Sequence, residues 1–87
     1  MSAIAIRQLD FQHQGRKLTV IAIADGIADL WRIDIRDGTR RVAVEIIEVM
    51  PETVYDAKVT GFSDDFVGYW MEYLREGVLS GRYALQP

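Results

Sequence analysis

Apolar and polar residues alternate almost without interruption along residues 31–46, which read WRIDIRDGTRRVAVEI. This alternation is typical of strands that bury one face, because successive side chains of a strand point to opposite sides of the sheet. The pair Asp37-Gly38 interrupts the segment near its middle. Asp-Gly is a strong signal for a two-residue turn, since both residues tolerate the positive φ that such turns need. The segment is therefore predicted to be a β-hairpin with one buried face.

Two further turn signals lie upstream, Gly15 in HQGRK and Asp25-Gly26 in IADGIA. The segments between the turns have strand length and are rich in Ile and Val, which favour strands. The predicted strands are residues 3–13, 17–24, 27–36 and 39–49. Four strands joined by short turns form an antiparallel meander.

Short loops at the three turns also predict the register of the meander. The predicted neighbours are Ile33 and Val42, Trp31 and Val44, Val20 and Trp31, Leu18 and Ile33, with Leu9 and Phe11 beside Leu18 and Val20. A slip of one residue would place a strand's side chains on the wrong face. In this register one face gathers Leu9, Phe11, Leu18, Val20, Trp31, Ile33, Val42, Val44 and Ile46.

The segment after the fourth strand, residues 51–61, fits two interpretations. Tyr55, Ala57 and Val59 have the spacing of an edge strand, whereas Pro51 can open a helical turn. We favour an extended crossover, which leaves room for a fifth strand at the edge of the sheet.

The stretch FSDDFVGYWMEYLREG, residues 62–77, predicts a helix. Ser63 is a favourable N-cap, and Gly77 suits the position after the last turn. Apolar residues cover roughly 200° of this helix, more than the roughly 100° needed to lie on one sheet. The following segment SGRYALQP predicts a tail that docks through Tyr83 and Leu85.

The expected fold is α+β, a four-stranded antiparallel β-meander packed on one face by a C-terminal α-helix. A chain of 87 residues is short enough for one domain, residues 1–87. The net charge of −3 gives no overall attraction to nucleic acid or anionic lipid. The absence of cysteine fits a reducing cytoplasm, and no apolar run approaches the roughly 20 residues of a membrane span. We expect a soluble cytoplasmic protein that does not bind membranes.

The second face of the predicted meander, here called the reverse face, is apolar at one end. One helix cannot cover both faces of a sheet, and a soluble monomer rarely exposes an apolar patch beyond a few hundred Å². The cover is either the chain's own residues 51–61 or tail, or a second copy. The wide apolar arc of the helix favours a second copy, and thus a homodimer. The predicted self-association surface comprises Ile4, Ile6, Ile21, Ile23, Leu30, Ile47, Val49, Tyr69 and Tyr73.

The arginines of the 31–46 hairpin form a candidate patch for an anionic ligand or single-stranded nucleic acid: Arg32, Arg36, Arg40 and Arg41. Asp34 is expected opposite Arg41, which is ordinary cross-strand pairing. Asp34 and Asp37 also oppose anion binding, and that face has no aromatic residue for base stacking. A solvated hairpin is the favoured interpretation, and a binding patch is the alternative.

No residue pattern predicts catalysis. The only histidine, His13, lies at a predicted turn tip, without the partner and pocket that a general base needs. Neither a phosphate-binding loop nor metal-ligand spacing occurs, so we expect no cofactor and no metal. The predicted function is a small, non-enzymatic module that associates with itself, with another protein as an open possibility. The alternative is a nucleic-acid-binding or anion-binding module, which the acidic charge disfavours.

Overall fold

The computed structural model describes residues 4–26, 30–43 and 46–86. Within these residues five strands form one antiparallel sheet of order β1-β2-β3-β4, with β5 also paired to β3. The strands are β1 (Ile4–His13), β2 (Arg16–Asp25), β3 (Trp31–Asp37), β4 (Arg40–Arg41) and β5 (Ile47–Val49). Two helices follow, α1 (Pro51–Val59) and α2 (Phe66–Leu79).

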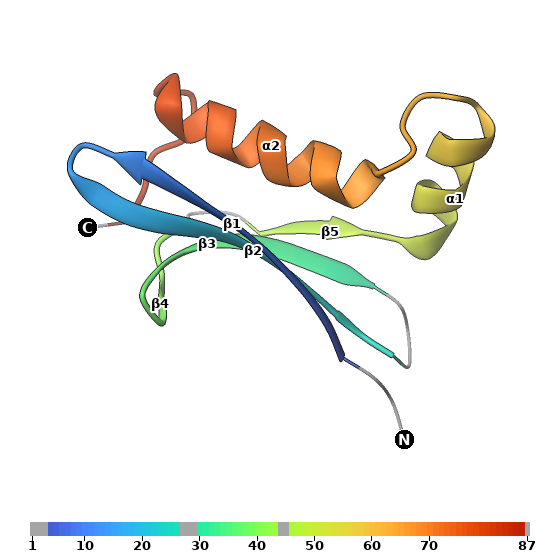
Figure 1. The fold of residues 1–87 in the computed structure, drawn as a ribbon, viewed down its shortest axis with the longest axis horizontal. Coiled ribbons are helices and arrows are strands. Elements are labelled where there is room, and N and C mark those ends of the chain that lie inside the picture. The colour runs from blue at the N-terminus through green and yellow to red at the C-terminus, as the bar shows by residue number, and fades with distance from the viewer. Residues whose placement is uncertain (1–3, 27–29, 44–45, 87) are drawn as a thin grey trace.

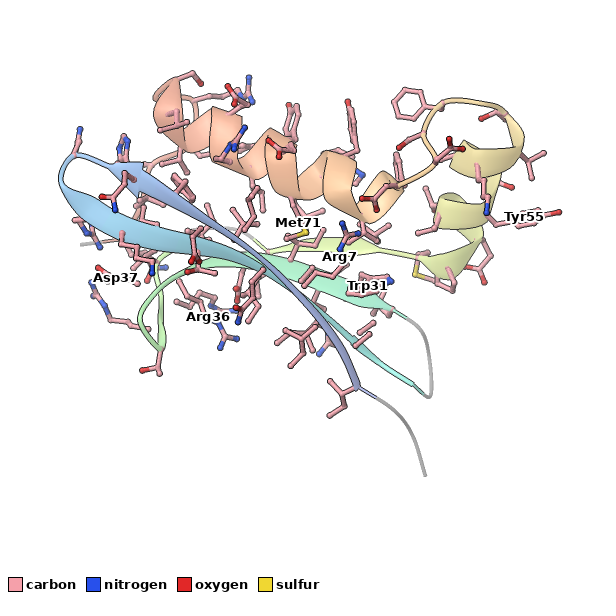
Figure 2. All side chains as sticks on the ribbon, in the orientation of Figure 1. Arg7, Trp31, Arg36, Asp37, Tyr55 and Met71 are labelled. Carbon is pink, nitrogen blue, oxygen red and sulfur yellow. The ribbon has the colours of Figure 1, made fainter. Side chains whose placement is uncertain are left out.

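Both helices lie on one side of the sheet (Figure 1). α2 packs on β1, β2 and β3 and buries Val67, Met71, Leu74 and Val78. Met71 points from α2 toward the sheet (Figure 2). The predicted fold class, an antiparallel meander covered on one face by a C-terminal helix, is confirmed. Neither described helix covers the reverse face, and neither is long and apolar enough to cross a bilayer.

The first hairpin has the predicted register. Leu9 lies opposite Val20, and Phe11 lies opposite Leu18. The turn closes at Gln14 and Gly15, which both have positive φ. Two-residue hairpin loops of this kind match the twist of the strands they join.

The second hairpin differs from the prediction in register but not in which face its residues occupy. Trp31 lies opposite Ala24, four residues from its predicted partner Val20. Ile33 lies opposite Ala22, also four residues from its predicted partner Leu18. The connection is therefore longer than a two-residue turn. An even displacement keeps every side chain on its side of the sheet. Trp31 and Ile33 consequently still face α2, where Ile33 has no exposed surface.

The third turn closes one residue later than predicted. Asp37 lies opposite Arg40, so the loop consists of Gly38 and Thr39. Gly38 has a φ of 64°, and glycine at the first loop position is typical of a type II′ turn. Asp37 stays in the strand, where its carboxylate accepts a hydrogen bond from Arg16 at 2.7 Å.

A bulge interrupts the predicted fourth strand. The N–H groups of Val42 and Ala43 both donate to the carbonyl oxygen of Ile35, at 2.9 and 3.3 Å. Two residues thus oppose one, and the predicted pairing of Val42 with Ile33 is wrong. The predicted pairing of Trp31 with residue 44 is also wrong, because Trp31 lies opposite Val49; residue 44 itself lies outside the described residues.

Beyond the bulge the side chains change sides. Arg41 lies opposite Arg36, and Ile47 lies opposite Ile33. Between these two pairs β3 covers three residues and the strand beside it covers six, so that strand contains three extra residues. Because this excess is odd, it reverses the faces. Ile47 lies opposite Ile33 and Val49 opposite Trp31, so both face α2. Ile46, predicted for that side, lies on the reverse face.

The C-terminal tail docks as predicted. Leu85 forms a β-bridge with Ala43, and the N–H of Gln86 donates to the carbonyl oxygen of Val42 at 2.7 Å. Tyr83 and Leu85 pack against the core. The tail therefore pairs with the two residues of the bulge, Val42 and Ala43.

The extended crossover predicted for residues 51–61 is wrong, because α1 is a helix. Pro51 stands in its first turn, where a missing N–H costs nothing. Glu52 in the first turn and Lys58 in the last complement the helix dipole. Ala57 is the buried residue of α1.

The N-terminus of α2 is tied to the sheet. Its N-cap is Asp65 rather than the predicted Ser63. The Asp65 carboxylate accepts a hydrogen bond from the N–H of Gly68 at 3.1 Å. Arg7 of β1 donates two further hydrogen bonds to the same carboxylate, at 2.6 and 2.7 Å. Arg7 accordingly lies between β1 and α2 (Figure 2).

The variant Asp65→Ala should lower the free energy of unfolding by about 1–2 kcal/mol at neutral pH, since it removes a helix cap. Hydrogen bonds from Arg7 hold the pKa of Asp65 below its ordinary value of 3.8. A lowered pKa in the folded state means that the contribution is complete above about pH 4 and is lost as the pH falls further. Urea unfolding at about pH 7 and pH 3 measures this difference.

The matched control is Asp65→Asn, which keeps a cap and removes the charge. The Asp65 side chain is 57% exposed, so this charge contributes at most about 1 kcal/mol. An equal loss of stability for Asp65→Ala at both pH values would contradict the assignment.

α2 continues beyond Gly77, the residue predicted to follow its last turn, to Leu79. Val78 is 1% exposed and belongs to the core. Gly77 is buried inside the helix, and the ring of Tyr83 lies where a Cβ of residue 77 would be. This close approach, rather than a helix end, explains the glycine.

Candidate functional site

The reverse face carries exposed aliphatic side chains at one end. Ile4, Ile6 and Ile46 are 67%, 57% and 41% exposed. Ile23, opposite Ile6, and Leu30 are half-buried. By strand alternation these side chains point away from α2. They form an apolar group on the side of the sheet without helices.

A hollow of about 390 Å³ opens next to this group. Its lining residues are Ile21, Ile23, Leu30, Arg32, Asp34, Arg36, Arg41 and Ile46. Arg36 points away from α2 (Figure 2). The hollow thus joins an apolar part to a charged part and suits an occupant with both characters.

Asp34 lies in the hollow with unused hydrogen-bonding capacity. It is 7% exposed, the buried charged residue among those described. Its Oδ1 lies 3.4 Å from the Nε of Arg36, but neither atom has a hydrogen-bond partner among the described residues. A buried polar atom without a partner costs about 1–3 kcal/mol. The predicted pairing of Asp34 with Arg41 is wrong, because the turn closes one residue later.

Three of the four predicted arginines come together, since Arg32, Arg36 and Arg41 line the hollow. Their positive charge is partly balanced, because the Nε atom of Arg32 lies 3.5 Å from the Oε2 atom of Glu48. Arg40 is separated from them, since it lies opposite Asp37 on the side that faces α2.

The predicted self-association surface does not form one patch. Ile47 and Val49 face α2, and the prediction that they lie on the reverse face is wrong. Tyr69 and Tyr73 lie on α2, on the other side of the sheet. The part on the reverse face is Ile4, Ile6, Ile21, Ile23 and Leu30, and Ile46 joins it.

Ile46 is the residue of this surface that the sequence reasoning missed. The signal is the adjacent apolar pair Ile46-Ile47, which breaks the alternation and marks the change of face.

No known protein family, characterised protein or solved structure matches this chain. Within the described residues no three His, Cys, Asp or Glu side chains are grouped to hold a metal ion.

Proposed function

We propose that this protein is a small self-associating module, in which a second copy covers the reverse face by sheet-on-sheet contact. The observation that carries the proposal is the exposure of Ile4, Ile6 and Ile46 on the side of the sheet without helices. Their burial between two copies is favourable at roughly 25 cal/mol per Å² of apolar surface.

The layout of the reverse face suits such an interface. In the view down the shortest axis of 18 Å, α2 and the sheet lie one above the other (Figure 1), so the reverse face spans the 38 Å and 18 Å extents of the molecule. A twofold axis through the apolar end would put the isoleucines of both copies at the centre. Arg36 and Arg41 would then lie at the rim, which matches the apolar core and polar rim of protein interfaces.

The hollow supports the same proposal. Asp34 Oδ1 and Arg36 Nε are buried and have no hydrogen-bond partner in the described part of the chain. Buried polar atoms are normally satisfied by protein or water. A partner side chain that enters the hollow would bring apolar atoms to Ile21 and a polar group to Asp34.

The proposal is tested with Ile6→Glu, which places a charge in the apolar centre. We expect the dimer to weaken by at least about 30-fold, since residues in such centres contribute about 2 kcal/mol or more. The matched control is Val59→Glu, because Val59 is 65% exposed on α1, away from the reverse face. Light scattering after gel filtration measures the mass, and circular dichroism checks the fold.

An Ile6→Glu protein with the same mass as the unchanged dimer would overturn the proposal. Equal dissociation by Val59→Glu would overturn it too, because the loss would then reflect general charge rather than the reverse face.

The alternative function is a module that binds an anionic ligand or single-stranded nucleic acid. It is favoured by Arg32, Arg36 and Arg41 lining one hollow and opposed by Asp34, Glu48 and the net charge of −3. A gel shift with single-stranded DNA and RNA tests it, and absence of binding at about 50 mM salt eliminates it.

The proposed location is the cytoplasm, which the absence of cysteine supports. The proposal assigns the module no catalytic activity, and its role is to bring copies of the chain together.

A further inference from the structure

Six aromatic rings form a continuous row on α2 and the segments beside it, here called the aromatic ridge: Phe62, Phe66, Tyr69, Trp70, Tyr73 and Tyr83. Neighbouring ring centroids lie 5.2–6.4 Å apart. The ring contacts are mostly edge-on, with stacked contacts between Phe66 and Tyr69 and between Tyr69 and Tyr73, and both are geometries that aromatic pairs prefer. The ridge is therefore an ordered surface rather than a set of separate side chains.

The core does not account for the outer part of the ridge. The residues that α2 buries are Val67, Met71, Leu74, Gly77 and Val78. Phe62 is 61% exposed and Tyr69 is 42% exposed. The apolar arc of α2, which is wider than one sheet requires, thus ends in aromatic rings that face solvent.

A guanidinium group already occupies one end of the ridge. The Cζ atom of Arg82 lies 4.5 Å from the centroid of the Tyr73 ring and 5.5 Å from that of Tyr83. The Nη2 atom of Arg82 also donates a hydrogen bond to the carbonyl oxygen of Tyr73 at 3.4 Å. Arg82 shows within the molecule which kind of group these ring faces accept.

The charge around the ridge is negative. Residues 51–83, which include every ring of the ridge, carry six acidic and three basic side chains, a net charge of −3, whereas the charges of the rest of the chain cancel. Glu72 and Asp65 are engaged by arginines. Asp64, two residues after Phe62, forms no ion pair within the described part of the chain. An acidic setting attracts cations and disfavours anionic partners.

We propose that the aromatic ridge binds an arginine-containing segment of another protein. Arginine side chains would stack on the exposed rings of Phe62 and Tyr69, as Arg82 does on Tyr73, while the acidic groups attract the segment. Arginine suits this role better than lysine, because its planar guanidinium is less strongly hydrated and stacks on aromatic faces.

The test uses a fluorescein-labelled peptide of four Gly-Arg repeats and measures fluorescence anisotropy at about 50 mM salt. We expect saturable binding of this peptide and weaker binding of the matching Gly-Lys peptide. A Gly-Glu peptide should not bind. Binding should weaken as salt is added, since the acidic groups act over the Debye length.

The deciding variant is the double substitution Phe62→Ala/Tyr69→Ala, which removes the two most exposed rings of the ridge. We expect at least about fivefold weaker binding, because each exposed cation–π contact contributes modestly. The matched control is Tyr55→Ala, since Tyr55 is 67% exposed on α1 and takes part in none of the ring contacts that form the ridge in the described residues. It points away from the molecule (Figure 2), and its removal should change binding less than about twofold.

Absence of binding to the Gly-Arg peptide would overturn the proposal. Equal binding of the Gly-Lys peptide together with unchanged binding by the double variant would overturn it as well, since acidic groups alone would then explain the affinity. Loss of the dimer in the double variant would show that a second copy occupies the ridge. The variant Ile6→Glu should bind the peptide as tightly as the unchanged protein does, because Ile6 lies on the reverse face. Failure of the peptide-binding proposal can therefore be distinguished from failure of the self-association proposal.

Discussion

Leu18→Ala is expected to lower the free energy of unfolding by about 2–5 kcal/mol. Leu18 has no exposed surface, faces Phe11 across the first hairpin and belongs to the core between the sheet and α2. Removing its branched end leaves a cavity that the surrounding strands and helix cannot fill completely. For a domain of this size the melting temperature should fall by roughly 10–30 °C.

Urea unfolding followed by circular dichroism measures this loss, with Val59→Ala as the control. Val59 is 65% exposed, so its truncation should change stability by less than about 0.5 kcal/mol. A loss below about 1 kcal/mol for Leu18→Ala would contradict the assignment of the core.

Gly77→Ala is expected to cost about 1–3 kcal/mol, although alanine is by itself the better helix former. The new Cβ would collide with the ring of Tyr83, which packs directly on Gly77. The N–H of Tyr83 also donates to the carbonyl oxygen of Gly77 at 3.0 Å, so the tail cannot move away without losing this bond.

A double-mutant cycle with Tyr83→Ala tests this contact. In the Tyr83→Ala protein, Gly77→Ala should be neutral or stabilising by up to about 1 kcal/mol, because only helix propensity remains. Additive losses of stability for the two substitutions would show that Gly77 and Tyr83 do not act on one another.

The predictable part of the fold is the part in which local rules agree with packing. The first hairpin has a single short turn at Gly15, and its predicted register is confirmed. For the second hairpin the period of two assigned Trp31 and Ile33 to the correct face, although the loop is longer than expected. Face assignments survive register errors that are even in residue number.

The break in the fourth strand could not be predicted from turn signals, because it depends on tertiary contacts. Val42 and Ala43 share one carbonyl oxygen, and the tail supplies the replacement partners Leu85 and Gln86. These partners lie more than forty residues later in the chain. The pair Ile46-Ile47 carried the only local sign of the change of face.

The helix at α1 was predictable in principle. Pro51, Glu52 and Lys58 are all favourable at the positions they occupy. The alternation of Tyr55 and Val59 around Ala57 pointed instead to a strand. Both tyrosine and valine prove to be exposed, so that alternation reflected no buried face.

The candidate site was predictable where it lies on regular strands. The reverse-face positions of Ile6, Ile23 and Arg36 follow from alternation within regular strands. The loss of Ile47 from that face, and the arrival of Ile46, follow from the bulge. The unsatisfied Oδ1 of Asp34 depends on distances between side chains that no sequence pattern contains.

Sedimentation equilibrium of the unchanged protein between about 5 and 100 µM tests the central claim most directly. If a second copy covers the exposed isoleucines, the mass at the upper concentrations should approach twice the chain mass of 9.9 kDa. A mass of 9.9 kDa at every concentration would mean that the bare side of the sheet stays in contact with water.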